Sequence, residues 1–154
     1  LRLSDATYGQ CSVAAVGVAA HECGHAIQHA RGYAPLQFRS ALVPVANFGS
    51  MIAWPLIVLG LFINSQSSAM IINIGILAFS LAVLFQLVTL PVEYNASGRA
   101  VRILAETGMM QGEEIVATKK VLNAAALTYV ASAAAAILQL VRILILTGGR
   151  RRDD

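Results

Sequence analysis

The chain has 154 residues, of which 57% are hydrophobic and only 12% are charged. A water-soluble domain of this length needs more charged residues to cover its surface, so the composition excludes an ordinary soluble protein and predicts a membrane protein. The formal net charge of +3 comes from scattered basic residues without interleaved aromatic ones, which excludes a nucleic-acid-binding surface. Two cysteines are too few for a disulfide framework.

The first predicted helix covers residues 12–31, SVAAVGVAAHECGHAIQHAR, and carries all three histidines of the chain. Ser12 is a suitable N-cap, and Gly32 followed by Pro35 is a suitable stop. We expect this helix to lie at a membrane face and not to span the bilayer.

Two uncharged stretches, 41–63 and 69–90, are each long enough to cross a bilayer. At 1.5 Å per residue the first is roughly 34 Å long. Pro44 and Pro55 lie inside it, and prolines are tolerated in membrane helices. Pro91 is expected to end the second stretch. Because the polar loop between the two spans is short, they are predicted to be antiparallel neighbours.

A polar region, 92–120, follows, with a helix-like first part, a break at Gly108 and a second short helix from about Glu113. The third predicted span, 121–147, is rich in small residues, which let helix backbones approach closely in lipid. The sequence therefore predicts an all-α integral membrane protein with about three transmembrane helices. We expect 1–154 to form a single membrane-embedded domain.

Basic residues predict how the chain is oriented. The basic residues before and after the first two spans are expected on the side of the membrane opposite the uncharged loop. The positive-inside rule assigns that loop to the outer side. These basic residues are Arg31, Arg39, Arg99, Arg102, Lys119 and Lys120. The cluster Arg150–Arg152 falls on the outer side if the third span crosses fully. The orientation of that span is therefore left open.

The segment His21-Glu22-Cys23-Gly24-His25 has the pattern His-Glu-x-x-His. Residues i and i+4 share a helix face, so His21 and His25 can present ring nitrogens to one metal ion, with Glu22 placed to take a proton from bound water. Two imidazoles and a carboxylate, with an open fourth position, suit one zinc ion. The alternative is a metal-free, hydrogen-bonded histidine pair, which is costly to bury.

Glu93 is the best candidate for the third ligand. It follows Pro91, and the predicted hairpin returns it to the membrane face that the chain leaves at Arg39, where the 12–31 helix is expected. We expect Glu93 to start a helix, so its alternative role is a carboxylate stabilised by a helix N-terminus. The remaining glutamates of the polar region are expected on the solvated surface: Glu106, Glu113 and Glu114.

Other classes of zinc protease do not fit this chain. A metzincin needs a third histidine six residues after His25, but that position is Arg31. A site-2-type intramembrane protease needs an aspartate in a later span, and the predicted spans contain none. His29 shares a face with His25, but it lies about 12 Å along the helix from His21, too far for one ion.

The segments VAAHECGHAIQHA, RSALVP and LPVEYNASGRA resemble the putative neutral zinc metallopeptidases, a family of bacterial integral-membrane proteins. The resemblance covers nearly the whole chain and implies an N-terminal transmembrane helix before Leu1. The chain is more distantly similar to membrane heat-shock and CAAX-prenyl proteases, which pair His-Glu-x-x-His with Glu-x-x-x-Asp. Here Ser97 stands four positions after Glu93, in place of the aspartate. Residues that we expect to support the ligands or contact substrate are His29, Asn95, Ser97 and Arg99.

Together, motif and resemblance favour a gluzincin-like, zinc-dependent membrane endopeptidase that hydrolyses peptide bonds of peptides or membrane proteins with metal-activated water and Glu22 as the catalytic base. We expect a multi-pass protein of the bacterial inner membrane, in contact with lipids, with its site at the cytoplasmic face. The oxyanion donor stays open among Tyr94, Arg99, Arg102 and His29. The rival hypothesis is a zinc-binding membrane scaffold or chaperone-like partner without proteolytic activity. Neither the substrate nor the oligomeric state is indicated.

Overall fold

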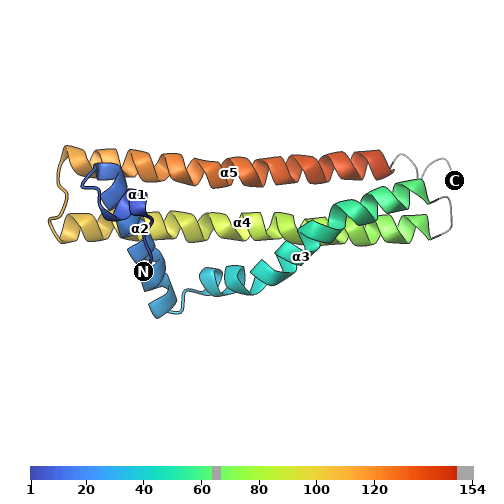
Figure 1. Ribbon diagram of the computed structural model, residues 1–154, viewed down its shortest axis with the longest axis horizontal. Coiled ribbons are helices and arrows are strands. Elements are labelled where there is room, and N and C mark those ends of the chain that lie inside the picture. Colours follow the sequence, from blue (N-terminus) through green and yellow to red (C-terminus); the bar gives the residue numbers. More distant parts are fainter. Residues whose placement is uncertain (64–66, 149–154) are drawn as a thin grey trace. The chain divides into compact units, whose positions relative to one another are not determined.

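The computed structural model describes residues 1–63 and 67–148, and this part of the chain is α-helical (Figure 1). Its helices follow in the order α1 (Asp5–Tyr8), α2 (Val13–Ala30), α3 (Ala34–Phe62), α4 (Ser68–Glu106) and α5 (Glu113–Gly148). The last three are long and apolar enough to cross a membrane. The prediction of an all-α membrane protein with three spans is confirmed.

The ends of α2 lie within one residue of the predicted 12–31 helix. The Ser12 hydroxyl accepts a hydrogen bond from the backbone N–H of Ala15 at 3.2 Å, which caps the helix. Gly32 follows the helix with a φ of 60°, a left-handed conformation that glycine adopts without strain. α3 begins before the predicted start of the first span and continues through Pro44 and Pro55.

The prediction that Pro91 ends the second span is wrong. α4 continues through Pro91 as far as Glu106. Proline removes one backbone hydrogen bond from a helix, but tertiary packing can offset that loss, and the residues just after Pro91 are buried. Glu93 consequently lies in the interior of α4, so the expectation that it starts a helix is also wrong. Stabilisation by a helix N-terminus is excluded as its role.

The short helix expected from Glu113 and the predicted span 121–147 form a single helix, α5. The break at Gly108 is confirmed as the turn between α4 and α5. Gly108 and Gly112 have φ values of 67° and 51°, so this turn uses two left-handed positions. α4 and α5 are each longer than a bilayer crossing requires, which leaves helical turns beyond the hydrocarbon core.

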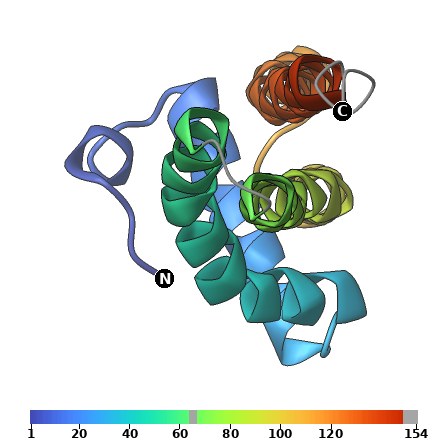
Figure 2. The ribbon, with the colours of Figure 1, turned by 90° about the vertical axis from the view of Figure 1, so that its right-hand side faces the viewer.

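The chain divides into two compact units, and each unit contains parts of the long helices. The first consists of Leu1–Gln37 and Thr89–Val130, and here α2 packs across α4 and beside α5 (Figures 1 and 2). Its core is built from small and medium apolar side chains: Ala20, Ala100, Leu104, Met110 and Leu122. That the whole chain acts as one domain stays a prediction.

The second unit comprises the described residues of Phe38–Val88 and Ala131–Asp154. In it, a Cβ at Gly49 would lie 2.7 Å from the Ala78 carbonyl oxygen, and one at Gly60 would meet Ile72. As the residue number increases along α3, the residue number of the contacting position in α4 decreases. The two helices are therefore antiparallel, which confirms the predicted hairpin. Residues 64–66 of the predicted polar loop lie outside the described residues.

Large apolar side chains are exposed along the helices of the second unit. Phe62 is 85% exposed, and Leu138 and Ile145 are each 69% exposed. In water such a surface would be unfavourable, whereas lipid acyl chains are its natural surroundings. The Arg150–Arg152 cluster, on which the orientation of the third span depends, lies outside the described residues.

Candidate metal centre

A close approach of two helix backbones places the candidate site within the first unit. Gly24 of α2 lies directly against α4, and a Cβ at this position would collide with the carbonyl oxygen of Ala96. The buried Ala20 and Ala100 extend the same contact with small side chains. Because α2 is held this close, histidine side chains on its inner face reach the carboxylate of α4.

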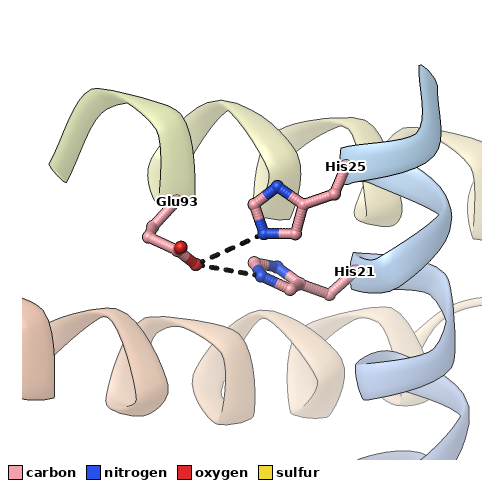
Figure 3. A group of neighbouring side chains, drawn as sticks. All are labelled: His21, His25 and Glu93. Atoms are coloured by element: carbon pink, nitrogen blue, oxygen red, sulfur yellow. Dashed lines mark hydrogen bonds and ion pairs between the residues drawn. The ribbon is translucent and has the colours of Figure 1, made fainter. Parts of the chain in front are cut away.

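His21 and His25 project from α2 toward Glu93 on α4 (Figure 3). One carboxylate oxygen, Oε2 of Glu93, lies 3.1 Å from Nε2 of His21 and 3.5 Å from Nε2 of His25. The two imidazole rings are nearly perpendicular, at 88°. One ligand atom from each residue lies within 4.8 Å of the others, so the structure brings together the three residues predicted to hold the metal.

The cluster places one carboxylate beside two imidazole rings. Glu93 is only 3% exposed, and the histidine side chains are also largely covered. The contact with the Glu93 carboxylate raises the pKa of His25 above its ordinary value, against the opposing effect of burial. A buried carboxylate facing two imidazole nitrogens thus attracts a cation, which is either a proton or a metal ion.

The geometry suits zinc. Ligands about 2.1 Å from a tetrahedral ion lie roughly 3.4 Å from one another, and the two contacts to Glu93 measure 3.1 Å and 3.5 Å. The donor set of two imidazoles and one carboxylate is that of an open catalytic zinc site rather than a closed structural one. The residues present therefore fit the ion.

Gln28 contacts the cluster but is not among the residues predicted from the sequence. Its side chain is fully buried, and its carbonyl oxygen Oε1 lies 3.0 Å from Nδ1 of His25. Its amide nitrogen donates to the backbone oxygen of Val92 at 2.9 Å and to Oδ1 of Asn95 at 3.0 Å. Every polar atom of this buried amide is therefore used, which holds the His25 ring in place.

The same hydrogen bonds determine which nitrogen of His25 carries the proton. Arg99 Nε, which can only donate, bonds to Oδ1 of Asn95 at 2.7 Å, so that atom is the amide oxygen. Oδ1 of Asn95 also accepts a hydrogen bond from the Gln28 side chain, so the atom of Gln28 that faces it is the amide nitrogen. The Gln28 oxygen is therefore the atom that faces Nδ1 of His25. Nδ1 must then be an N–H donor, so Nε2 is the nitrogen that faces Glu93 and that can take either a metal ion or a proton.

Ser97 supports the other histidine. Its hydroxyl lies 3.1 Å from Nδ1 of His21 and can accept the N–H of that ring, again leaving Nε2 for a metal. Ser97 stands four residues after Glu93, one turn further along α4. The structure thus brings Ser97, Asn95 and Arg99 into contacts that lead to the two histidines.

Three other residues of α2 do not belong to the cluster, and two of them, Glu22 and His29, were predicted site residues. Glu22 is half-buried beside His21, and within the described part of the chain no residue forms a hydrogen bond with its carboxylate. His29 is exposed and does not belong to the cluster. Cys23 is half-buried and also lies outside it.

A sequence signal for Gln28 does exist. Gln28 stands three residues after His25, a spacing that places two side chains on neighbouring turns of one helix face. A polar side chain on the inner face of a small-residue helix needs a hydrogen-bond partner, and the imidazole is the nearest one. The spacing alone does not show whether the amide faces inward.

The chain matches the family described as "Putative neutral zinc metallopeptidase" over residues 1–148. It is also 46% identical, over 151 residues, to "Putative membrane protease YugP" of Bacillus subtilis (strain 168). That alignment covers 97% of this chain and 66% of the relative, so the chain spans just under two thirds of the relative's length. No solved structure matches the chain significantly. On the extent of these matches, the chain belongs to the family of putative neutral zinc metallopeptidases.

Proposed function

We propose that the protein is a zinc-dependent membrane endopeptidase. One observation carries the proposal: both imidazoles turn Nε2 toward the same oxygen of Glu93, while each Nδ1 contacts a separate supporting side chain. A purely structural hydrogen-bonded cluster has no need to aim three ligand atoms at one point. The family match and the name of the bacterial relative, a putative membrane protease, also support peptide-bond hydrolysis.

A zinc ion in this site would polarise the scissile carbonyl and lower the pKa of the attacking water. His21, His25 and Glu93 would hold it, and Ser97 and Gln28 would keep the two rings in their ligating orientation. Glu22 accepts the proton from the attacking water and passes it to the leaving amine. Its carboxylate suits this role because no described residue engages it in a hydrogen bond.

The rival function, a zinc-binding scaffold without proteolysis, is less well supported. A structural zinc site is closed by a fourth protein ligand. Within residues 1–63 and 67–148, the cluster contains two histidines and one glutamate only. An open position next to an unengaged glutamate favours hydrolysis.

We also infer that the site faces the cytoplasm in a bacterial inner membrane. Arg99 and Arg102 lie on α4 one to three turns beyond Glu93, and Lys119 and Lys120 lie in the facing part of α5. Basic residues next to membrane spans favour the cytoplasmic side. Labelling of a cysteine introduced at Lys120, in a chain whose Cys11 and Cys23 are replaced by serine, tests this in intact cells and in inverted vesicles. Reaction in intact cells with an impermeant reagent would contradict it.

Glu22→Gln tests the proposed reaction. The glutamine keeps the size of the side chain but cannot accept the proton, so peptide hydrolysis is expected to fall by about 100- to 10,000-fold. Zinc content is expected to remain that of the wild type, because Glu22 is not a ligand. Peptidase assays and metal analysis of the same purified membrane preparation measure both quantities.

The matched control is Glu106→Gln, which makes the same change at an exposed position of α4. This variant should retain both zinc and hydrolysis. If zinc-loaded wild type hydrolyses no peptide or membrane protein, or if Glu22→Gln is as active as the wild type, the proposed peptidase is wrong. A wild-type protein that binds zinc but hydrolyses no substrate would favour the zinc-binding scaffold.

Gln28→Leu tests how the His25 ring is held. Leucine is similar in size but cannot accept from Nδ1, so the ring loses its orienting partner. Loss of such a partner typically weakens metal affinity by about 10- to 100-fold, and we expect zinc affinity to fall by this amount in a competition with a chromogenic chelator. Unchanged affinity would show that Gln28 does not position His25. Asn95→Asp is the conservative comparison, since it retains the oxygen that accepts from Gln28 and Arg99.

A further inference from the structure

A groove between α4 and α5 begins beside the candidate metal centre and reaches two basic side chains. It lies within the first unit and has a volume of about 470 Å³. Along α4 its lining starts at Tyr94 and Ser97 and reaches Arg102, and Lys119 faces it from α5. Gly98 widens the groove, since a Cβ there would have no neighbour within 4 Å.

The groove approaches the metal centre at Ser97. Ser97 lines it and also lies 3.1 Å from Nδ1 of His21. Tyr94, at the same end, directly follows Glu93 in α4. At this end of the groove the Ser97 side chain separates a bound molecule from His21, while His21, His25 and Glu93 do not themselves line the groove.

Charge and polarity define what the groove can bind. Arg102 and Lys119 are both exposed, and neither forms an ion pair with a carboxylate within the described part of the chain. No acidic residue contributes to the lining. Between the basic residues and the metal centre, Val101 and Leu122 provide apolar walls. The complementary ligand is an apolar segment that ends in an anionic group.

We propose that this groove binds the peptide substrate and selects an acidic side chain a few residues from the bond that is cleaved. The inference rests on the proposed peptidase function and specifies its substrate class. From Glu93 to Arg102 the rise along α4 is roughly 13 Å, and an extended peptide advances about 3.3 Å per residue. The favoured glutamate or aspartate therefore lies about three to five residues from the scissile bond.

Peptide binding by the zinc-loaded Glu22→Gln chain tests the groove separately from catalysis. The full chain is placed in nanodiscs of phosphatidylcholine and titrated with fluorescent, C-terminally amidated apolar peptides. Each peptide carries a single Glu, or Gln at the same position. Two exposed ion pairs predict that the Glu peptide binds about twofold to thirtyfold more tightly.

Variants assign this preference to the groove. In Arg102→Glu/Lys119→Glu the preference should be lost or reversed, whereas Lys120→Glu, the same change at an exposed neighbour outside the lining, should leave it intact. Gly98→Leu should weaken binding of both peptides, because the added side chain fills open space. Circular dichroism and zinc content verify that each variant is folded.

Several results would overturn the inference. These are equal binding of the Glu and Gln peptides, a preference that survives the double charge reversal, or a preference seen only with a free C-terminal carboxylate. Loss of the preference when phosphatidylglycerol is added would assign the groove to lipid headgroups instead. Cleavage of these peptides by the wild type reports separately on the proposed function: binding without cleavage would reject the peptidase and retain the groove.

Discussion

Replacing Glu93 by glutamine is expected to abolish stoichiometric zinc binding. Among the residues that the structure describes, its carboxylate is the one group that faces Nε2 of both His21 and His25, at 3.1 Å and 3.5 Å, and it is almost completely buried. A neutral amide cannot compensate the charge of the ion. The loss of affinity should exceed the roughly 10- to 100-fold that follows from loss of an outer hydrogen-bond partner. Metal analysis after gel filtration with a competing chelator measures it.

Glu106→Gln provides the comparison for this prediction, since it changes an exposed carboxylate of the same helix. It should bind one equivalent of zinc with unaltered affinity. Thermal unfolding in detergent, followed in the presence of EDTA, shows whether the metal-free fold survives in both variants. Full zinc occupancy in folded Glu93→Gln would mean that the third ligand is a different residue.

Adding one methyl group at Gly24 is expected to disrupt the site as severely as removing a ligand. The new Cβ in Gly24→Ala would collide with the backbone carbonyl of Ala96, which cannot rotate away as a side chain would. Overpacking of a core typically costs about 1–3 kcal/mol, and a clash with helix backbone lies at or above the upper end of that range. α2 must move from α4, which separates His21 and His25 from Glu93.

Two measurements check the Gly24→Ala prediction: the thermal unfolding midpoint in detergent and the zinc content. Both are expected to fall. Gly98→Ala is the control for these two quantities, because its Cβ meets nothing within 4 Å and alanine favours a helix more than glycine does. Wild-type stability and zinc content in Gly24→Ala would contradict the close packing of α2 on α4.

Strong local patterns made the larger features of this fold predictable. The His-Glu-x-x-His spacing requires a helix, and the uncharged stretches on either side of a short loop require an antiparallel hairpin. The hairpin in turn returns the chain to the membrane face it left, which made Glu93 the preferred third ligand. The structure places that carboxylate beside both histidines.

Pro91 shows where local propensity misleads. In water a proline inside a helix is a strong signal for its end, and the sequence provides no measure of the packing that opposes it. From Val92 to Leu104, buried residues recur along one face of α4. The helix therefore continues, and Glu93 is presented from a rigid helix interior rather than from a flexible helix end.

Gln28 shows a second limit. Glutamine is common on solvated helix surfaces, so its three-residue spacing from His25 does not by itself reveal a buried amide. Its role depends on partners that are distant in sequence, Val92 and Asn95, and on the orientation that Arg99 imposes on Asn95. Such a network becomes visible only once α2 and α4 are placed against each other.

The most direct test of the metal centre is X-ray absorption at the zinc edge, recorded on the purified, zinc-loaded protein. Ligation by His21, His25 and Glu93 predicts a shell of nitrogen and oxygen atoms at about 2.0–2.2 Å, with the multiple scattering of two imidazoles. A sulfur shell at about 2.3 Å would instead indicate a cysteine ligand such as Cys23. That shell, or the absence of any bound zinc, would contradict the proposed site.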